Sequence, residues 1–387
     1  MKNKFLIALL CSVVPVLAQA NPVFVKTGSY KGKAAFILND LPFYFSGVNS
    51  YWLMQKQAQH QGNAFVENLF EEVKALGFNV IRTWAFADGH QWTHPSDPAI
   101  LQKSPGIYNE ATFKALDYVI AKASEKNVKL ILTLTNNWGD FGGIQEYVKW
   151  AGLSDSKEFF TNEKVKILFK NHLTKILSRK NSYTGILYRS DPAIFSWELC
   201  NEARIPGDTT TGATLRNWYQ EMARHIKSID SNHMISTGEE GFDISQDYYS
   251  NEYSNTYPFQ GTEGSSYQLN TVIDEISYAT AHFHPNSWGL NDQNDGNKWI
   301  KDHIELANEH GKPFVLGEYG DVQSFDVFDW LATLSQEGGA GSLLWGFLPL
   351  LVPKGITEDA TTVRYPKNAA FIGALSAHAI QMNDLRN

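Results

Sequence analysis

Two glutamates stand out in this sequence because of the residues beside them. Glu202 ends the segment WELCNE at 197–202, and Glu318 lies in the segment GEYG at 317–320. Each follows a short apolar run that is typical of a buried strand. Two carboxyl groups can share the work of breaking a glycosidic bond, because one protonates the departing oxygen while the other attacks or activates water. A single Glu at a strand end is more often solvated or salt-bridged, so this interpretation depends on its surroundings.

Other polar and aromatic residues also end apolar runs. They lie in IRTW at 81–84, NNW at 136–138, HFH at 282–284 and LWG at 344–346. The charge of Arg82 can hold a nearby carboxylate ionised. Asn201 can hydrogen-bond a sugar 2-hydroxyl, and Trp345 can form a flat floor under a sugar ring. Together these residue types favour sugar chemistry far more than any of them does alone.

The elements that must position these residues alternate regularly along the chain. Helical spacing of apolar residues is found over 64–76, 110–125, 165–177, 215–229, 299–309 and 325–334. Strands are predicted at 43–49, 79–84, 129–135, 193–199, 234–237, 275–282, 313–316 and 341–345. Eight strands separated by helices predict an α/β fold of the (β/α)8 type, a TIM barrel, whose functional residues follow the strand ends. An open doubly wound sheet is the rival, but GVNS at 47–50 lacks a glycine-rich phosphate loop.

Domain organisation follows from the two ends of the chain. Residues 1–20 predict a signal peptide: Lys2 and Lys4 precede an apolar stretch that ends in AQA at 18–20, whereas a buried N-terminal helix is the alternative. Residues 24–44 predict a β-hairpin that caps the barrel bottom. Residues 21–387 then form a single catalytic domain, in which the polar stretch 246–271 is a loop that walls the cleft. Cys200 is the only cysteine left after cleavage, so no internal disulfide is expected.

Composition excludes several partners. The net charge of −8 becomes −10 without Lys2 and Lys4, and no basic run is present, so nucleic acid is a poor partner. No later segment is apolar enough to cross a membrane. The chain contains 11 Trp, 17 Tyr and 23 Phe, which suits both a barrel core and a groove that stacks sugar rings. No cofactor is implied, and we expect a secreted monomer.

Four other residues or pairs of residues invite a different interpretation. His282 and His284 share one strand face and could be metal ligands of an amide or ester hydrolase, although further ligands would be needed. Glu239 and Glu240 are adjacent, so their side chains point to opposite faces and cannot act jointly. The side chain of Glu198 is expected to face the barrel interior, and Cys200 to be a buried thiol. A barrel that binds sugar without cleaving it is a further alternative, which the presence of both carboxylates disfavours.

Across nearly the whole mature chain, the sequence resembles glycoside hydrolase family 5, and specifically its endo-β-1,4-mannanases. The motifs that carry the resemblance are FYFSGVNSYW at 43–52, VIRTWAF at 80–86, NNWGDFGG at 136–143 and DPAIFSWELCNE at 191–202. The resemblance implies a retaining hydrolase that cleaves mannan, glucomannan or galactomannan. A β-1,4-glucanase of the same clan is the runner-up. A retaining mechanism predicts carboxyl groups about 5–5.5 Å apart.

The resemblance also implies a role for each motif residue. Glu202 is the expected acid/base and Glu318 the nucleophile. Expected to bind substrate are Arg82, Trp84, Asn137, Trp138, Asn201, Arg204, His282, His284 and Trp345. Two positions depart from the family pattern: Ala203 replaces the usual proline, and His284 replaces a tyrosine that hydrogen-bonds the nucleophile. Because imidazole titrates near neutral pH, His284 predicts a limb in the pH profile of activity.

Overall fold

The computed structural model describes residues 22–59, 64–89, 99–208, 211–249, 253–320, 322, 324–351, 362–364 and 367–385. The predicted signal peptide, residues 1–20, lies outside these ranges. Among the described residues, no helix has both the length and the apolar character needed to cross a membrane.

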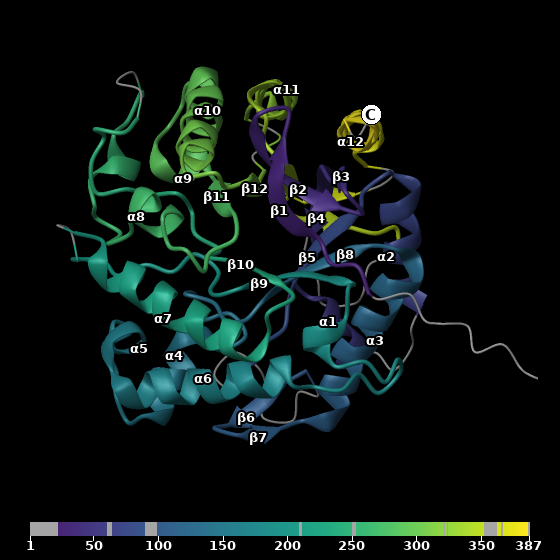
Figure 1. Cartoon of the computed structure of the whole chain (residues 1–387), viewed down its shortest axis with the longest axis vertical. Coiled ribbons are helices and arrows are strands. Elements are labelled where there is room, and N and C mark those ends of the chain that lie inside the picture. Colours follow the sequence, from purple (N-terminus) through teal and green to yellow (C-terminus); the bar gives the residue numbers. More distant parts are fainter. Residues whose placement is uncertain are drawn as a thin grey trace, which may run out of the picture.

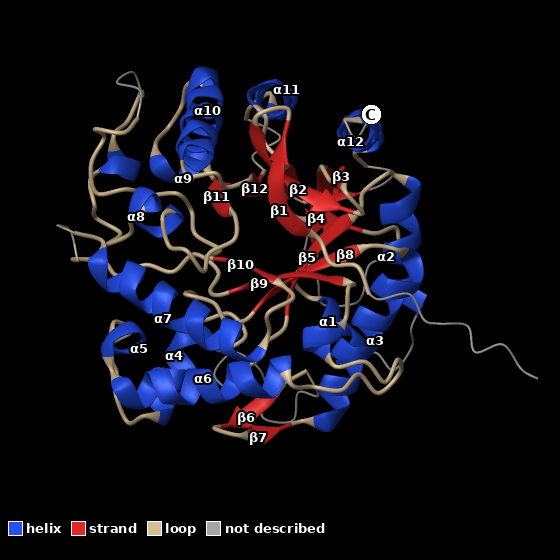
Figure 2. Cartoon of the chain, in the orientation of Figure 1, coloured by secondary structure: helices blue, strands red, loops and turns tan. Residues whose placement is uncertain are grey.

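An eight-stranded parallel sheet forms the centre of the molecule and curls into a nearly closed barrel (Figures 1 and 2). Its strands are β4 (Phe45–Asn49), β5 (Val80–Trp84), β8 (Lys129–Thr133), β9 (Ile194–Glu198), β10 (Met234–Ser236), β11 (Ala279–Phe283), β12 (Phe314–Tyr319) and β13 (Gly341–Leu344). Seven neighbouring pairs are joined in the order β10-β9-β8-β5-β4-β13-β12-β11. The N–H of Ser277 donates to the carbonyl of Ile235 at 2.8 Å and links the two edges. The prediction of a (β/α)8 barrel is confirmed.

Helices surround the barrel, and they include the six that the sequence predicts between its strands (Figure 2). They are α1 (Leu53–Gln59), α2 (Ala64–Ala75), α3 (Glu110–Lys126), α4 (Gly143–Trp150), α5 (Glu158–Thr161), α6 (Glu163–Leu177), α7 (Ala213–Ile229), α8 (Tyr267–Thr271), α9 (Pro285–Trp288), α10 (Gln293–Glu309), α11 (Val327–Glu337) and α12 (Ala369–Asp384), with 3-10 turns η1 (Tyr188–Ser190) and η2 (Tyr257–Phe259). Local signals set their ends. The Asn109 side chain accepts from the N–H of Ala111 at the start of α3, and Asn127 ends that helix with a φ of 53°.

The boundaries of some predicted elements were wrong. The sixth strand begins at Ala279 rather than at residue 275, because a turn in which the N–H of Ile276 donates to Ile273 precedes it. Helix α10 begins at Gln293, six residues before the predicted 299, because the capping box of Asp292 and Asp295 starts the helix before its apolar stripe. The predicted loop 246–271 contains η2 and α8.

A small antiparallel sheet covers the bottom of the barrel. The predicted hairpin is a three-stranded sheet of β1 (Lys26–Tyr30), β2 (Lys33–Leu38) and β3 (Leu41–Pro42). Phe36 of β2 packs edge-on against Phe195 and Tyr278, with ring centroids 4.9 and 5.3 Å away. Short pairs β6 (Gln102–Ser104) with β7 (Ile107–Tyr108), and β14 (Phe347–Leu348) with β15 (Val363–Arg364), lie outside the barrel.

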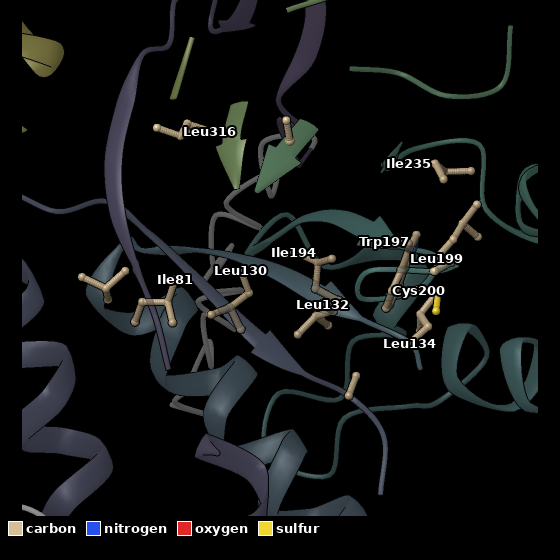
Figure 3. Close-up of a cluster of buried hydrophobic side chains, with 14 of the residues drawn as sticks. Ile81, Leu130, Leu132, Leu134, Ile194, Trp197, Leu199, Cys200, Ile235 and Leu316 are labelled. Carbon is tan, nitrogen blue, oxygen red and sulfur yellow. The ribbon is translucent and has the colours of Figure 1, made fainter. Parts of the chain in front are cut away.

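Side chains alternate between the two faces of each barrel strand and so divide into two cores. Outward-facing Ile81, Leu130 and Leu132 pack with the helices (Figure 3). Inward-facing Val80 and Ile131 join the aromatic cluster at the bottom of the barrel. Two residues further along the same strands, the inward positions become polar, at Arg82 and Thr133. The period of two therefore places a polar layer inside the barrel, directly above an apolar one.

Candidate active site

A cleft of about 450 Å³ opens at the carboxyl ends of the barrel strands. Its walls include both predicted catalytic glutamates, and its lining residues are Trp84, Asn136, Trp138, Asp140, Asn201, Glu202, Arg204, Glu240, Tyr257, His284, Ser287, Trp288, Glu318 and Trp345. Of the predicted site residues, Arg82 and His282 lie fully buried beneath the cleft. The position of the cleft follows from the fold, because loops after the strands of such a barrel converge at this end.

Arg82 organises the base of the cleft. Its guanidinium donates to Glu318 Oε1 at 2.6 Å and to Asn201 Oδ1 at 2.6 Å. It also donates to Glu198 at 2.6 and 2.9 Å and to Asn49 Oδ1 at 3.0 Å. These contacts engage the whole donor fork of a side chain that is 1% exposed. Glu198 faces the barrel interior as predicted, and it is the buried counter-charge that lets Arg82 remain there.

Glu202 is aimed into the cleft by an unusual backbone conformation. Its φ of 52° lies in the left-handed region, which costs a residue with a side chain about 1–3 kcal/mol. Hydrogen bonds from Glu202 N to Gly238 O at 2.8 Å and from Asn201 N to Thr135 O at 2.9 Å hold this turn between neighbouring strand ends. These hydrogen bonds to neighbouring strand ends thus offset the strain of the backbone conformation that positions the carboxyl group.

Three neighbours set the protonation state of Glu202. His282 Nδ1 lies 2.9 Å from Glu202 Oε1, and Trp138 Nε1 donates to Oε2 at 2.6 Å. Burial raises the pKa of Glu202, but the hydrogen bond from His282, the charges of His282 and His284, and the Trp138 contact together lower it to about 2. In the free protein this carboxyl group is therefore a carboxylate at neutral pH.

Glu318 lies between two cationic groups. His284 Nε2 is 3.0 Å from Glu318 Oε2, while Arg82 holds Oε1. Burial raises the pKa of Glu318, but the charges of His282 and Arg82 lower it more, so the pKa falls below its usual value. One oxygen of Glu202, one nitrogen of His282 and one oxygen of Glu318 lie within 4.8 Å of one another. Such a group of side chains could hold a metal ion, and it shares His282 with the pair considered from the sequence. The positive charge of Arg82 beside Glu318 opposes the binding of a cation here.

The histidine at position 284 carries a strongly shifted pKa. Burial lowers the pKa of His284, but the hydrogen bond to Glu318 and the charges of Glu318, Glu202 and Glu240 raise it to about 9. His284 is thus an imidazolium at neutral pH. Since its folded-state pKa exceeds the unfolded value of about 6.5, its contribution to stability is complete below pH 6.5 and is lost as pH rises through 9.

We expect His284→Tyr to change the alkaline side of the activity profile. In the parent protein, kcat/KM should fall as pH rises through about 9, because the imidazolium beside Glu318 loses its charge. The tyrosine variant has no such charge to lose at this pH, so its kcat/KM should no longer fall as pH rises through about 9. Profiles of kcat/KM from pH 5 to 11 measure this, with His310→Tyr as the control at an exposed histidine. An identical alkaline limb in both variants contradicts the assignment.

Arg204 lies on the other side of Glu202, in a cage of opposite charge and aromatic rings. Its guanidinium binds Glu240 through two hydrogen bonds of 2.6 Å and Glu263 at 3.1 Å. Trp138 and Phe242 flank it at 5.0 Å each. The pair of carboxylates and the two rings hold Arg204 although Ala203 replaces proline. Burial and the charge of Glu202 raise the pKa of Glu240, and the hydrogen bonds and charge of Arg204 oppose that rise.

The sequence predicts substrate binding by Asn137 rather than by Asn136, and it does not predict several other residues of the site. Asn136 lines the cleft, whereas Asn137 Oδ1 accepts from the backbone N–H of Arg204 at 3.3 Å. Asn49, which orients Arg82, was not predicted, although its place at the end of the first barrel strand was a signal. The cleft residues Tyr257, in η2, and Trp288, in α9, were not predicted, whereas Glu240, one of the two adjacent glutamates after β10, does reach the edge of the cleft. Trp345 lines the cleft as predicted and stacks on Tyr51 at 5.4 Å.

Residues 23–335 match a family model described as GH family 5 beta-mannosidase-like. The chain is 40% identical over 325 residues to mannan endo-1,4-beta-mannosidase 1 of Arabidopsis thaliana, a match that covers 79% of this chain and 75% of the relative. The tomato (Solanum lycopersicum) enzyme of the same name is 38% identical over 338 residues, covering 80% and 81%.

Solved structures show the same fold. An endo-1,4-beta-D-mannanase from Thermotoga petrophila superposes with a TM-score of 0.80 at 31% identity, covering 87% of this chain and 99% of that one. An endo-1,4-beta-mannanase from Rhizomucor miehei gives a TM-score of 0.80 at 30% identity, covering 93% and 99%. The family match over most of the chain, together with the barrel and its paired carboxylates, shows that this protein belongs to glycoside hydrolase family 5.

Proposed function

We propose that this protein is an endo-β-1,4-mannanase that hydrolyses internal bonds of mannan, glucomannan or galactomannan with retention of configuration. The observation that carries the proposal is the pair Glu202 and Glu318, with an oxygen of each within 4.8 Å of the other in the cleft. This spacing favours the roughly 5–5.5 Å of retaining enzymes over the roughly 6.5–9.5 Å of inverting ones. The mannan specificity rests on the names of the relatives.

In the first step, Glu318 attacks the anomeric carbon and Glu202 protonates the departing glycosidic oxygen. A covalent glycosyl-enzyme results, and Glu202 then accepts a proton from the water that hydrolyses it. Arg82 and His284 hold Glu318 ionised until it attacks. Asn201 donates to the 2-hydroxyl of the reacting sugar, whose ring lies on Trp345.

The lowered pKa of Glu202 must rise before this residue can act as an acid. His282 Nδ1 lies 2.9 Å from this carboxyl group, within hydrogen-bond distance. When a sugar chain displaces water from the cleft, the carboxylate of Glu202 loses solvation, and its neutral, protonated form is favoured.

The appearance of new reducing ends tests this function. We expect the mature protein to release them from mannan much faster than from cellulose, and Glu202→Gln to release almost none. Proton NMR of the first products should show the β-anomer. Faster release from cellulose would make the protein the β-1,4-glucanase of the alternative, and α-anomeric products would contradict the assignment of Glu318 as nucleophile.

We also propose that the protein is secreted and acts as a monomer. The pattern of residues 1–20 supports secretion, because a charged start, an apolar stretch and AQA typify cleaved signals. Mass spectrometry of protein recovered outside the producing cells, combined with its N-terminal sequence, checks cleavage after residue 20.

A further inference from the structure

The polar layer beneath the cleft contains a chain of amide contacts that reaches the cleft itself. Asn201 Oδ1 accepts from Arg82 Nη2 at 2.6 Å, and Asn201 Nδ2 donates to Asn136 Oδ1 at 3.0 Å. All three side chains are at least nine-tenths buried. Since Asn201 and Asn136 also line the cleft, whatever fixes these amides affects the groups that meet a sugar.

Only one orientation of each amide satisfies these contacts. A guanidinium has donors alone, so the atom of Asn201 that faces Arg82 must be the oxygen. The nitrogen of Asn201 then faces Asn136, which must present its own oxygen. One of the two hydrogens on Asn201 Nδ2 is used by this bond, and the other remains for an acceptor in the cleft.

The backbone holds Asn136 rigidly enough for this task. Asn136 and Asn201 form a parallel β-bridge that extends the pairing of β8 and β9. The carbonyl of Asn136 accepts from the N–H of Ile144 at 2.9 Å, at the start of α4. Gly143 is required here, because a Cβ on it would lie 2.3 Å from that carbonyl oxygen. The backbone that carries the Asn136 side chain is therefore held by Asn201 on one side and by the start of α4 on the other.

Asn136 makes this contact at a cost. Its Nδ2 is buried and has no hydrogen-bond partner within the part of the chain that the structure describes. A buried amide with an unpaired donor stabilises a fold poorly, and an apolar side chain would serve packing at least as well. The role that remains for the buried amide of Asn136 is its hydrogen bond with Asn201.

We propose that Asn136 is a positioning residue, which orients Asn201 so that its free N–H meets the 2-hydroxyl of the sugar being cleaved. The proposal rests on the proposed function, because it assumes that a sugar is bound above Asn201. Without Asn136, Arg82 still engages the oxygen of Asn201, but the amide plane can rotate about that single contact. The hydrogen bond to the 2-hydroxyl then loses its alignment in the transition state, where it contributes most.

The test compares two substrates that differ in one oxygen. They are an aryl β-mannotrioside and the same compound with a 2-deoxy sugar at the reacting position. We expect Asn136→Ala to lower kcat/KM by about tenfold on the first substrate, as the loss of one aligned hydrogen bond implies. On the 2-deoxy substrate, Asn136→Ala should match the parent protein, because the interaction that it supports is already absent.

The controls separate positioning from folding. Asn137→Ala alters the neighbouring asparagine that contacts Arg204, so it should leave the ratio of kcat/KM between the two substrates at the parent value. Asn136→Asp keeps an acceptor facing Asn201 and should also keep that ratio, whatever its added charge does to the absolute rates. The melting temperature of Asn136→Ala should equal or exceed that of the parent.

The remaining outcomes distinguish a failure of this proposal from a failure of the proposed function. An equal loss on both substrates in Asn136→Ala, or a ratio in Asn136→Asp as low as that in Asn136→Ala, overturns the proposal. If Asn136→Ala does not fold, Asn136→Ser repeats the comparison with a side chain too short to reach Asn201. A parent protein that leaves the mannotrioside intact while cleaving cellulose would refute the proposed function instead.

Discussion

Glu318→Ala should lower kcat on mannan by about 10⁴-fold or more, because the variant lacks the carboxylate that forms the covalent intermediate. Azide should partly restore its activity on an aryl mannoside by occupying the space of the lost carboxylate. The expected product is the α-mannosyl azide, because a single displacement inverts the anomeric centre. Product identification by NMR therefore reports which residue is the nucleophile.

Glu202→Ala is the matched comparison. On mannan it should lose about 10²–10⁴-fold, the usual contribution of general acid–base catalysis. On an aryl mannoside with a good leaving group, the first step should remain fast, since that leaving group needs no proton. Azide should then accelerate turnover by attacking the glycosyl-enzyme and should yield the β-mannosyl azide. If the two variants gave the opposite anomers, the roles of Glu202 and Glu318 would have to be exchanged.

The second large effect is on stability. We expect Arg82→Met to reduce the free energy of unfolding by about 3–5 kcal/mol, because it leaves Glu198 and Glu318 buried without their shared cation. Arg82 is 1% exposed and Glu198 is 2% exposed, so water cannot replace the lost contacts without local opening. Chemical denaturation at pH 7, followed by fluorescence of the buried tryptophans, measures the change.

Two further variants identify the cause. Arg82→Met combined with Glu198→Met should be more stable than Arg82→Met alone, because the unpaired charge at Glu198 is removed as well. Arg224→Met removes an exposed ion pair with Glu275, 2.7 Å long, and should cost no more than about 1 kcal/mol. A double variant that is less stable than the single one would show that the loss comes from packing rather than from buried charge.

The order of elements and the edge of the barrel that carries the chemistry could be predicted from the sequence. Apolar spacing changes between periods of 3.6 and 2 along the chain, and strand ends of a parallel barrel must meet on one side. Glu202 and Glu318 follow predicted strands, and Arg82 and Trp345 lie near the carboxyl ends of two others, so their convergence was foreseeable. Element ends were less certain, because capping contacts such as that of Asp292 extend a helix beyond its apolar stripe.

Only the tertiary structure decided which of two adjacent, similar residues faces the cleft and which charged groups surround each site residue. Asn136 and Asn137 look alike in sequence, and only the β-bridge to Asn201 turns the first toward the cleft and the second toward Arg204. The pKa of His284 depends on Glu318, Glu202 and Glu240, which come from three other strand ends. Local pattern determines which side of a strand is buried, but these partners are brought together only by closure of the barrel. The sequence alone therefore determined that paired carboxylates follow the barrel strands, and the folded barrel determined the charges and amides that control them.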